Sequence, residues 1–462
     1  MTASMLRLAW YGDDFTGASD TLATVAAAGL RAVLFTRVPT PRQLAAAGPL
    51  DALGVAGTAR ALAPAAMREE IAPVAAWFAT LGVPVTHYKC CSTFDSAPGV
   101  GNLALGVQAL RTAAHAPWVP VLGGQPSLGR YCAFAQLFAT ASAGGEVMRI
   151  DRHPTMSRHP VTPMHEADLR RHLAALGWTG VSHIDLRVLD GDDAGTLEAT
   201  LDTTLAATWE AATEATPGPA LESMPAASAA LGPIPPAVLF DTTGPQHLAR
   251  IGRLLWPHAR HRPLLVLGAS SVAQAFIAQW QAEGLSAPPP ARVTPAAGPV
   301  FVLAGSLSPV TATQVAEAGR HYETVELHVP SLVADDAYGQ RLADDCATRL
   351  RAGRHVLART SRPAGEGLPP LQVAQACGRL LARVLAAAPQ VRRIGVAGGD
   401  TSSFALRALD PWALRWVGPL APGIGLLRLC TDAPAQDGLE LILKGGQIGS
   451  PDLFERLLAG PR

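Results

Sequence analysis

The chain has 462 residues, of which 48% are hydrophobic and 16% are charged. A chain of this length and composition buries a large core and usually forms two or three domains. Its 37 basic and 37 acidic side chains cancel, so neither nucleic acid nor an anionic membrane surface is an expected partner.

The N-terminal residues lack the basic and apolar segments of a signal peptide, and no apolar run approaches the roughly 20 residues needed to span a bilayer. We therefore expect a cytoplasmic protein without a membrane segment. The six cysteines form no CxxC pair, which disfavours a structural zinc site or a disulfide framework. We expect them to be reduced and mostly buried, and it stays open whether Cys90 and Cys91 touch a substrate or fill space.

Short aliphatic or β-branched runs alternate with alanine-rich helical stretches along the whole chain. This alternation is typical of βα units wound into parallel sheets. We therefore predict an α/β fold with largely parallel, Rossmann-like sheets flanked by helices. In the first half the predicted strands are Leu6 to Tyr11, Ala32 to Phe35, Ala52 to Ala56, Val85 to Tyr88, Val119 to Leu122, Val181 to Ile184, Ala237 to Phe240 and Pro263 to Leu267.

Polar or glycine-rich residues follow most of these predicted strands at once. They are Gly12-Asp13-Asp14, Thr58-Ala59-Arg60, Lys89-Cys90-Cys91-Ser92, Gly123-Gly124, Asp241-Thr242-Thr243 and Gly268-Ala269-Ser270-Ser271. Ligands of open α/β sheets bind outside the carboxyl ends of the strands. We therefore expect these segments to converge on one crevice.

A proline-rich stretch at residues 285–298 disfavours both helix and central strand and suits a connector. It divides the chain into predicted domains at residues 1–284 and 299–462. A second biased region, residues 213–236, is more consistent with a surface excursion of the first domain. In the second domain the predicted strands are Val300 to Ala304, Thr324 to Val329, His355 to Ala358, Arg393 to Ala397, Leu426 to Cys430 and Leu439 to Leu443.

Two adjacent carboxylates, Asp13 and Asp14, stand where the first predicted strand ends and a helix begins. They suit sugar hydroxyls, Mg²⁺ or a role as general base, and the alternative is a helix cap, for which Asp is favoured. A cap needs one acidic residue and not two. We therefore expect the pair to do more than cap the helix.

In the second domain, Gly398-Gly399-Asp400-Thr401 follows a predicted buried strand and opens a helix. Glycines let a phosphate approach the backbone, and a helix N-terminus favours its negative charge. Asp400 could position Mg²⁺ or accept the proton of an attacking hydroxyl. A bland turn between strand and helix is the alternative.

Two more small-residue turns follow strands of the same domain, at residues 304–311 and 443–452. Three such turns in one sheet favour a phosphate site more than one does. Lys444 offers a point charge to a phosphate, or else marks a solvated strand end. There is no GxxxxGK[ST] motif, so the protein is not a P-loop protein.

A loop rich in arginine and histidine covers residues 149–164 and contains Arg152, Arg158 and His159 among helix breakers. Its guanidinium groups could clamp a carboxylate through bidentate contacts. The alternative is a solvated irregular loop.

Six stretches together resemble the four-carbon acid sugar kinase family, formerly a family of unknown function. They are GDDFTGASD, YKCCSTFDS, MSRHPVTPMHEADL, GSLSPVTATQV, VAGGDTSS and LKGGQIGSPDLF, in the family's order. The resemblance implies an N-terminal acid-sugar-binding domain, a C-terminal nucleotide-binding domain and an active site in the cleft between them. It also implies ATP-dependent phosphorylation of a terminal hydroxyl on tetronates or 3-oxo-tetronates.

The resemblance also assigns residues. It places the acid sugar beside Asp13, Asp14, Thr16, Gly17, Lys89, Ser92 and the His159-Pro160 segment. It places ATP beside Ser306, Ser308, Gly398, Gly399, Asp400, Thr401, Gly445 and Gly446.

One departure concerns the substrate. Many family members carry a lysine followed by DSTLRG, but Lys89 leads into CCSTFDS, without the Asp before Ser92-Thr93 or the Arg after them. A guanidinium expected near the carboxylate of the substrate is therefore missing. Arg60, Arg152 or Arg158 could replace it, and a branched 3-oxo acid is an alternative substrate.

We therefore predict an ATP- and Mg²⁺-dependent acid sugar kinase whose general base is Asp400, Asp13 or Asp14. The residues that hold the metal stay unassigned, and a homodimer stays open. One alternative is a lyase or aldolase-type enzyme that acts on the same acids. Another is a non-catalytic sensor that binds a sugar acid.

Overall fold

The computed structural model describes residues 6–114, 116–141, 145–159, 161–191, 193–214, 234–286, 292–361 and 368–461. It divides into two compact units, Met1–Ala32 with Ala46–Ala287, and Val33–Ala45 with Pro288–Arg462. Residues 287–291 of the predicted connector and residues 215–233 of the predicted excursion lie outside the described residues.

The first unit contains a seven-stranded sheet in the order β3-β1-β4-β11-β5-β10-β9, and all of its pairings are parallel. Most of its strand residues are buried, as expected for a parallel sheet covered on both faces. The strands are β1 (Leu8–Gly12), β3 (Ala52–Ala56), β4 (Val85–Lys89), β5 (Val119–Leu122), β9 (Val181–Ile184), β10 (Ala237–Phe240) and β11 (Leu264–Gly268).

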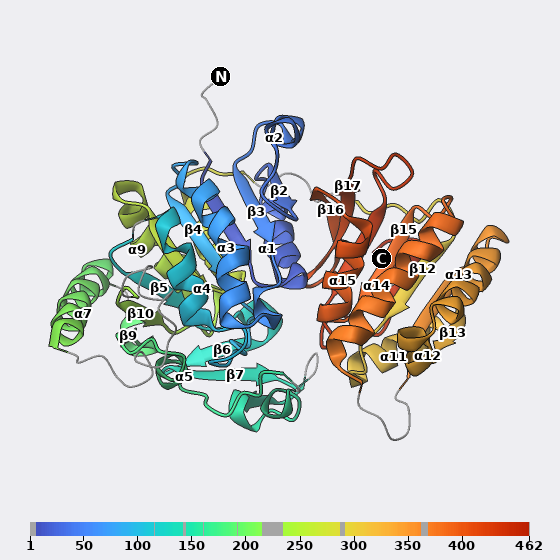
Figure 1. The fold of residues 1–462 in the computed structure, drawn as a ribbon. Coiled ribbons are helices and arrows are strands. Elements are labelled where there is room, and N and C mark those ends of the chain that lie inside the picture. Colours follow the sequence, from blue (N-terminus) through green and yellow to red (C-terminus); the bar gives the residue numbers. More distant parts are fainter. Residues whose placement is uncertain are drawn as a thin grey trace. The chain divides into compact units, whose positions relative to one another are not determined.

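Helices cover this sheet, with α3 packed on α4 (Figure 1) and α9 on α10. The helices are α1 (Phe15–Ala27), α3 (Pro64–Ala79), α4 (Leu103–Leu110), α5 (Leu169–Ala175), α6 (Leu186–Leu189), α7 (Ala194–Glu214), α9 (Pro245–His261) and α10 (Ser271–Ala282). A second, antiparallel sheet contains β6 (Arg130–Ala133), β7 (Gln136–Thr140) and β8 (Val147–Arg149).

The second unit contains strands in the order β13-β14-β12-β15-β18-β17-β16-β2. The first five run parallel, and the last three pair antiparallel. β2 comes from the N-terminal part of the chain and pairs with β16 through Leu34 and Phe35. The strands are β2 (Ala32–Phe35), β12 (Val300–Ala304), β13 (Glu323–Leu327), β14 (Val356–Thr360), β15 (Arg393–Ala397), β16 (Ala413–Ala421), β17 (Ile424–Cys430) and β18 (Glu440–Lys444).

The helices of the second unit pack on this sheet and on one another, with α14 between α13 and α15 (Figure 1) and with α11 on α16. They are α11 (Pro309–Ala318), α12 (Val329–Ala334), α13 (Asp336–Arg351), α14 (Pro370–Ala387), α15 (Gly399–Leu409) and α16 (Leu453–Ala459), and α2 (Pro41–Ala47) lies mostly in the chain segment contributed from the N-terminal part. The predicted α/β class with largely parallel sheets is confirmed.

Two groups of strands escaped the sequence analysis. β6 and β7 are joined by a turn at Phe134-Ala135, which lacks the glycine and asparagine that mark such turns. β16 contains Gly418 and Pro419, where its register with β17 shifts. The prediction of a strand as far as Val329 was also wrong, because this residue begins α12, which has a proline in its first turn.

Among the helices that the structure describes, none is both long and apolar enough to cross a membrane.

Candidate functional site

The carboxyl ends of the parallel strands in the first unit lie level with one another. Gly12 pairs with Ala56 and Lys89, Gly268 pairs with Lys89 and Leu122, and Leu122 pairs with Phe240. The polar segments that follow these strands therefore gather at one edge of the sheet, as the sequence analysis expected.

Asp14 caps helix α1 and also holds a cation. Its side chain accepts a hydrogen bond from the backbone N–H of Gly17, and its Oδ2 lies 2.8 Å from Nη1 of Arg60. The capping alternative is therefore correct for Asp14, while the binding and base roles of the acidic pair stay predictions. This leaves Asp13 as the carboxyl group available for another task.

Asp13 is only 2% exposed. Its N–H donates to the Lys89 carbonyl at 3.0 Å, and its carbonyl accepts from the Arg60 N–H at 3.1 Å. Its Oδ1 has no hydrogen-bond partner among the described residues. Burial and the neighbouring Asp14 carboxylate raise the pKa of Asp13 to about 8, although Lys89 and Arg60 act in the opposite direction.

Thr16 and Gly17 form the first turn of α1 beside this carboxyl group. The Thr16 hydroxyl is a second buried polar atom that lacks a partner in the described part of the chain. A Cβ on Gly17 would lie 2.6 Å from Nζ of Lys89 and 2.8 Å from Oδ1 of Asp14. Only glycine therefore lets the lysine approach so closely.

Lys89 is 3% exposed, and its Nζ donates to the Cys90 carbonyl at 2.5 Å. Burial lowers the pKa of this ammonium group, but the carboxylates of Asp14 and Asp13 raise it more, so the net pKa lies above the ordinary value. Lys89 is therefore charged at neutral pH and balances the acidic pair.

Arg60 links two carboxylates. Besides its contact with Asp14, its Nη2 and Nε lie 2.6 Å and 3.1 Å from Oδ2 of Asp95. Asp95 stands two residues after Thr93, at the position where the resemblance led us to expect an arginine. The charge at this position is therefore inverted, and Arg60 already has two acidic partners.

The buried carboxylate of Asp95 accepts hydrogen bonds from several neighbours. It accepts from the hydroxyls of Thr93 and Thr162, the latter at 3.0 Å. Burial alone would raise the pKa of Asp95, but Arg60 and His159 lower it below the ordinary value. The carboxylate is thus held charged as part of the site's framework.

The arginine-rich loop contributes unevenly to this edge of the sheet. His159 belongs to the cluster around Asp95, because its Nδ1 accepts from the Thr162 N–H at 3.1 Å. Arg152 and Arg158 are exposed. Ser92 is half-buried, and Pro160 lies outside the described residues.

A further polar group lies along α1, and of its members only Ser270 was named from the sequence. Oδ2 of Asp20 accepts from Nε2 of Gln125 at 2.9 Å and from the Ser270 hydroxyl at 2.5 Å. Gln125 follows β5, so the rule that named Ser270 after β11 could also have found Gln125. Arg130, which begins β6 just beyond Gln125, was also overlooked because the hairpin was not predicted.

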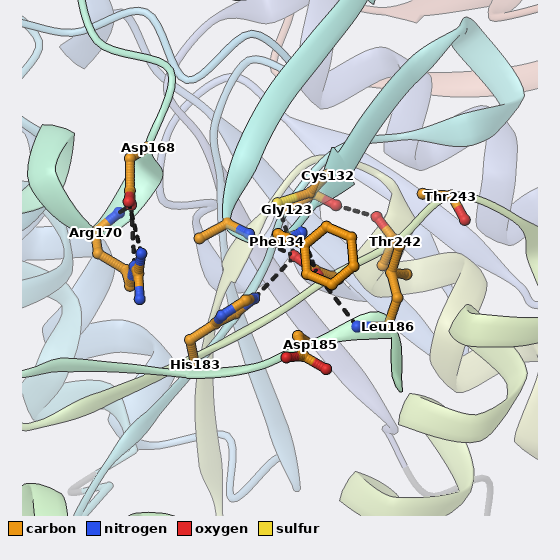
Figure 2. A network of polar contacts seen from close by, with 12 residues as sticks. Gly123, Cys132, Phe134, Asp168, Arg170, His183, Asp185, Leu186, Thr242 and Thr243 are labelled. Atoms are coloured by element: carbon orange, nitrogen blue, oxygen red, sulfur yellow. Dashed lines mark hydrogen bonds and ion pairs between the residues drawn. The ribbon is translucent and has the colours of Figure 1, made fainter. Parts of the chain in front are cut away.

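A buried carboxylate holds this hairpin in place (Figure 2). Oδ2 of Asp241 accepts from the Phe134 and Leu186 N–H groups at 2.6 and 3.2 Å, and Oδ1 accepts from the Ala135 N–H at 3.0 Å and lies 3.0 Å from Nε2 of His183. Phe134 and Ala135 have φ values of 53° and 64°, a region that side chains rarely adopt. The carboxylate stabilises the turn by accepting both N–H groups, so Asp241 supports the site rather than facing a ligand.

In the second unit, the three small-residue turns come together. β12, β15 and β18 are neighbours, with Ala397 paired to Ala304 and to Lys444. A Cβ on Gly305 would lie 2.2 Å from the Thr401 hydroxyl oxygen, and one on Gly446 would lie 2.7 Å from the Ser306 hydroxyl oxygen. The turns therefore pack against one another at one edge of the sheet.

The turn before α15 has the features expected of an anion site. Gly398 has a φ of 122° and precedes the first turn of the helix, where backbone N–H groups lack intrahelical partners. The Ser402 hydroxyl is buried without a partner among the residues described here. Asp400 is exposed on this turn, while Thr401 is 6% exposed. Gly399 and Gly445 are half-buried.

Ser308 caps α11 by accepting from the Thr311 N–H at 3.1 Å, and its hydroxyl donates to the Gly446 carbonyl. The Ser306 hydroxyl accepts from the Ser308 N–H at 3.3 Å. Both serines are half-buried. The predicted nucleotide residues of the first turn are thus tied to those of the last.

Lys444 differs from both interpretations of it. It is 0% exposed, and its Nζ donates to Oγ1 of Thr311 at 2.8 Å, to Oε1 of Gln314 at 2.7 Å and to the Gly446 carbonyl at 3.4 Å. Burial lowers the pKa of Lys444 to about 7. It is neither a solvated strand end nor a free point charge, because its three donors already have oxygen acceptors inside the protein.

Comparison with known proteins assigns these two units to two kinds of domain. Residues 8–276 match the model of a sugar-binding N-terminal domain, and residues 301–454 match that of a nucleotide-binding C-terminal domain. Together these matches span most of the chain.

Relatives match over nearly their whole length. The chain is 36% identical over 480 residues to a 3-oxo-isoapionate kinase of Paraburkholderia graminis, covering 98% of this chain and 94% of the relative. It is 28% identical over 466 residues to a 3-oxo-tetronate kinase of Methylobacterium radiotolerans, covering 98% and 99%.

Solved structures share the fold. A protein of Salmonella typhimurium LT2 matches with a TM-score of 0.70 and 22% identity over 98% of both chains. A Haemophilus influenzae protein matches with a TM-score of 0.66 and 22% identity, covering 97% of this chain and 98% of that chain. With the paired domain matches and the 36% identical kinase, the chain belongs to the four-carbon acid sugar kinase family of ATP-dependent kinases.

Proposed function

We propose that the protein transfers the γ-phosphoryl group of ATP to a terminal hydroxyl of a small 3-oxo acid sugar. A branched acid of the 3-oxo-isoapionate type is the first candidate, because the 36% identical relative is a kinase of that acid. 3-Oxo-tetronate, the substrate named for the 28% identical relatives, is the second.

The observation that carries this proposal is the pair of unsatisfied polar atoms at the end of β1. Oδ1 of Asp13 and the hydroxyl of Thr16 are buried and lack partners among the described residues. Buried polar groups are nearly always hydrogen-bonded in a resting structure, so such a pair supports a site for a ligand with hydroxyl groups. A sugar hydroxyl would satisfy both atoms.

Asp13 is our candidate for the general base. A base works best when its pKa lies near the operating pH, and the pKa of Asp13 is about 8. Asp14 is less suited, because it caps α1 and pairs with Arg60. Lys89 lies beside both carboxylates and offers positive charge for the transferred group.

The turns at Ser306, Gly398 and Gly446 are our candidates for the ATP site. Their glycines let phosphate oxygens approach the backbone, and the N–H groups at the start of α15 suit negative charge. Asp400 lies on the first turn of α15 with its side chain exposed to solvent, so its carboxylate is accessible to a bound nucleotide or ion.

Mg²⁺ fits this arrangement as an ion carried by the nucleotide. No three His, Cys, Asp or Glu side chains gather into a metal cluster in the described part of the chain. Mg²⁺ usually takes one or two carboxylates together with phosphate oxygens and waters, and Asp400 supplies one carboxylate. When bound, the ion would neutralise charge on the phosphate oxygens.

The placement of the active site between the two domains stays a prediction, as do a cytoplasmic location and a homodimer. The role of Asp400 in positioning Mg²⁺ or accepting a proton also stays a prediction. The lyase and sensor alternatives are disfavoured because the relatives are kinases and the second unit matches a nucleotide-binding domain.

A coupled assay of ADP release tests the proposal. The enzyme is mixed with ATP, Mg²⁺ and one acid at a time, namely 3-oxo-isoapionate, 3-oxo-tetronate and the corresponding reduced tetronates. We expect the highest kcat/KM for one of the 3-oxo acids and none without acid. Absence of ADP release with every acid would reject the kinase activity for this chain.

A further inference from the structure

The charges at the proposed sugar site nearly cancel before any substrate binds. Arg60 is paired with Asp14 and Asp95, and Lys89 lies beside Asp14. These cations therefore have carboxylate partners within the protein. The positive charges of Arg60 and Lys89 are therefore already balanced by protein carboxylates, and a different cation is needed for the carboxylate of an acid sugar.

Arg130 is a cation in a different situation. Its Nη1 donates to the Leu128 carbonyl, but its buried Nε has no hydrogen-bond partner among the described residues. No carboxylate of the described residues forms an ion pair with it. A guanidinium group has five N–H donors, and within the described part of the chain the buried Nε–H of Arg130 is left for another acceptor.

Arg130 lies at the same edge of the sheet as the sugar site. Its backbone forms two hydrogen bonds with that of Gln125, and the Gln125 side chain donates to Asp20 of α1. Helix α1 is the helix that Asp14 caps, so these contacts tie Arg130 to the element that carries Thr16 and Gly17.

The charge of Arg130 also reaches the altered motif after Lys89. Burial lowers the pKa of Arg130, and the largest opposing effect comes from Cys91. The Cys91 sulfur lies 3.0 Å from the Thr93 hydroxyl, which donates to Asp95. Cys91 thus interacts electrostatically with Arg130 and, through Thr93, lies near the Asp95 side chain.

Keeping a largely buried guanidinium without a carboxylate partner is costly, and the cost falls when an anion binds to it. We propose that Arg130 binds the carboxylate of the acid sugar. The proposal rests on the assignment of an acid sugar to this site. It replaces Arg60, Arg152 and Arg158 as candidates, because Arg60 is already paired and the other two are exposed.

Steady-state kinetics of Arg130→Gln and Arg130→Lys test the proposal, with whichever 3-oxo acid the wild-type enzyme prefers. We expect R130Q to raise the KM for the acid on the order of 100-fold, the loss typical of removing one partner of a buried charge pair. R130K should recover part of this loss, because it keeps the charge without the planar fork. The KM for ATP should stay unchanged.

Two further measurements separate binding from a structural role. Wild-type enzyme should prefer the acid over its uncharged amide, and R130Q should lose this preference. R130Q should melt at the wild-type temperature or above, because it removes a largely buried charge that has no carboxylate partner among the described residues. A lower melting temperature, with acid and amide still discriminated, would show a structural role and overturn the proposal.

The matched control is Arg171→Gln, whose side chain is 77% exposed beside Glu166. It should keep the wild-type KM for both substrates. A wild-type KM for the acid in R130Q would overturn the proposal, and so would a large rise in R158Q instead.

Thermal stabilisation by 3-oxo-tetronate without ATP distinguishes this inference from the proposed kinase activity. Stabilisation that needs Arg130, without ADP release by the wild type, would support the inference and reject the activity. ADP release with stabilisation that survives in R130Q would do the reverse. A wild type that neither binds the acid nor releases ADP would overturn both.

Discussion

Asp13 gives the sharpest test of the sugar site, through the change Asp13→Asn. Asn has the shape of a protonated Asp but does not titrate. Because the pKa of Asp13 in the folded protein is about 8, against an ordinary value of 3.8, the folded state strongly prefers the protonated form. The variant therefore isolates the free energy of ionising this buried group.

The sign and size of the effect follow from proton linkage. A folded-state pKa above the unfolded value contributes stability below about pH 4 that is lost as the pH rises through about 8. At about 1.4 kcal/mol for each pKa unit, the whole loss is about 6 kcal/mol. Linkage places about 4 kcal/mol of it between pH 5 and pH 9. D13N should not show this loss.

The measurement is the free energy of unfolding of both proteins in urea at pH 5, 7 and 9. Because the chain has two units, unfolding is followed by hydrogen exchange in peptides that cover β1 and α1. The advantage of D13N should grow by about 4 kcal/mol from pH 5 to pH 9. Asp202→Asn, at an exposed position of α7, is the matched control for the loss of one carboxyl group outside the site. A pH-independent difference for D13N would refute the reasoning.

The same variant tests the chemistry. If Asp13 is the general base, wild-type kcat/KM rises with pH as Asp13 ionises, up to about pH 8. D13N should lower turnover about 10²- to 10⁴-fold. Turnover near the wild-type level would remove Asp13 from the proton transfer.

Three further predictions concern the second unit. Gly398→Ala should lower the melting temperature and raise the KM for ATP, because Gly398 has a φ of 122° and a Cβ there would lie 3.0 Å from the Thr401 hydroxyl oxygen. Gly399→Ala is the control, since no atom lies within 4 Å of a Cβ at that position. Equal effects of the two substitutions would contradict this explanation. Lys444→Met should raise the KM for ATP about tenfold or more without changing the KM for the acid, because the Lys444 ammonium group links the Gly446 turn to α11. An unchanged KM for ATP would show that the turn keeps its conformation without Lys444. Asp400→Asn should lower turnover by orders of magnitude with an unchanged melting temperature, and near-normal turnover would exclude Asp400 from the chemistry.

The sequence predicted most of the sheet because buried parallel strands are short, continuous apolar runs. The strands β3, β5, β9, β10, β12 and β15 begin and end at the predicted residues. The turns after β12, β15 and β18 were also found, since glycines and hydroxyl residues that follow a strand are a local signal. Antiparallel β6, β7 and β16 were missed because their turns and bulges lack such a signal.

Only the tertiary structure decided what each charged side chain does. Arg60 and Asp95 are 35 residues apart, and Lys444 and Gln314 are 130 apart, so no local pattern shows that they are paired. Arg152 and Arg158 looked as suitable as Arg60 in the sequence, yet they are exposed. Arg130, on a hairpin that was not predicted, has a buried Nε without a partner among the described residues. The sequence by itself determined where the strands end and which small residues follow them, because those are local properties. Which charges are already neutralised depends on contacts between distant segments, and that is why the candidate for the substrate's carboxylate emerged only from the folded chain.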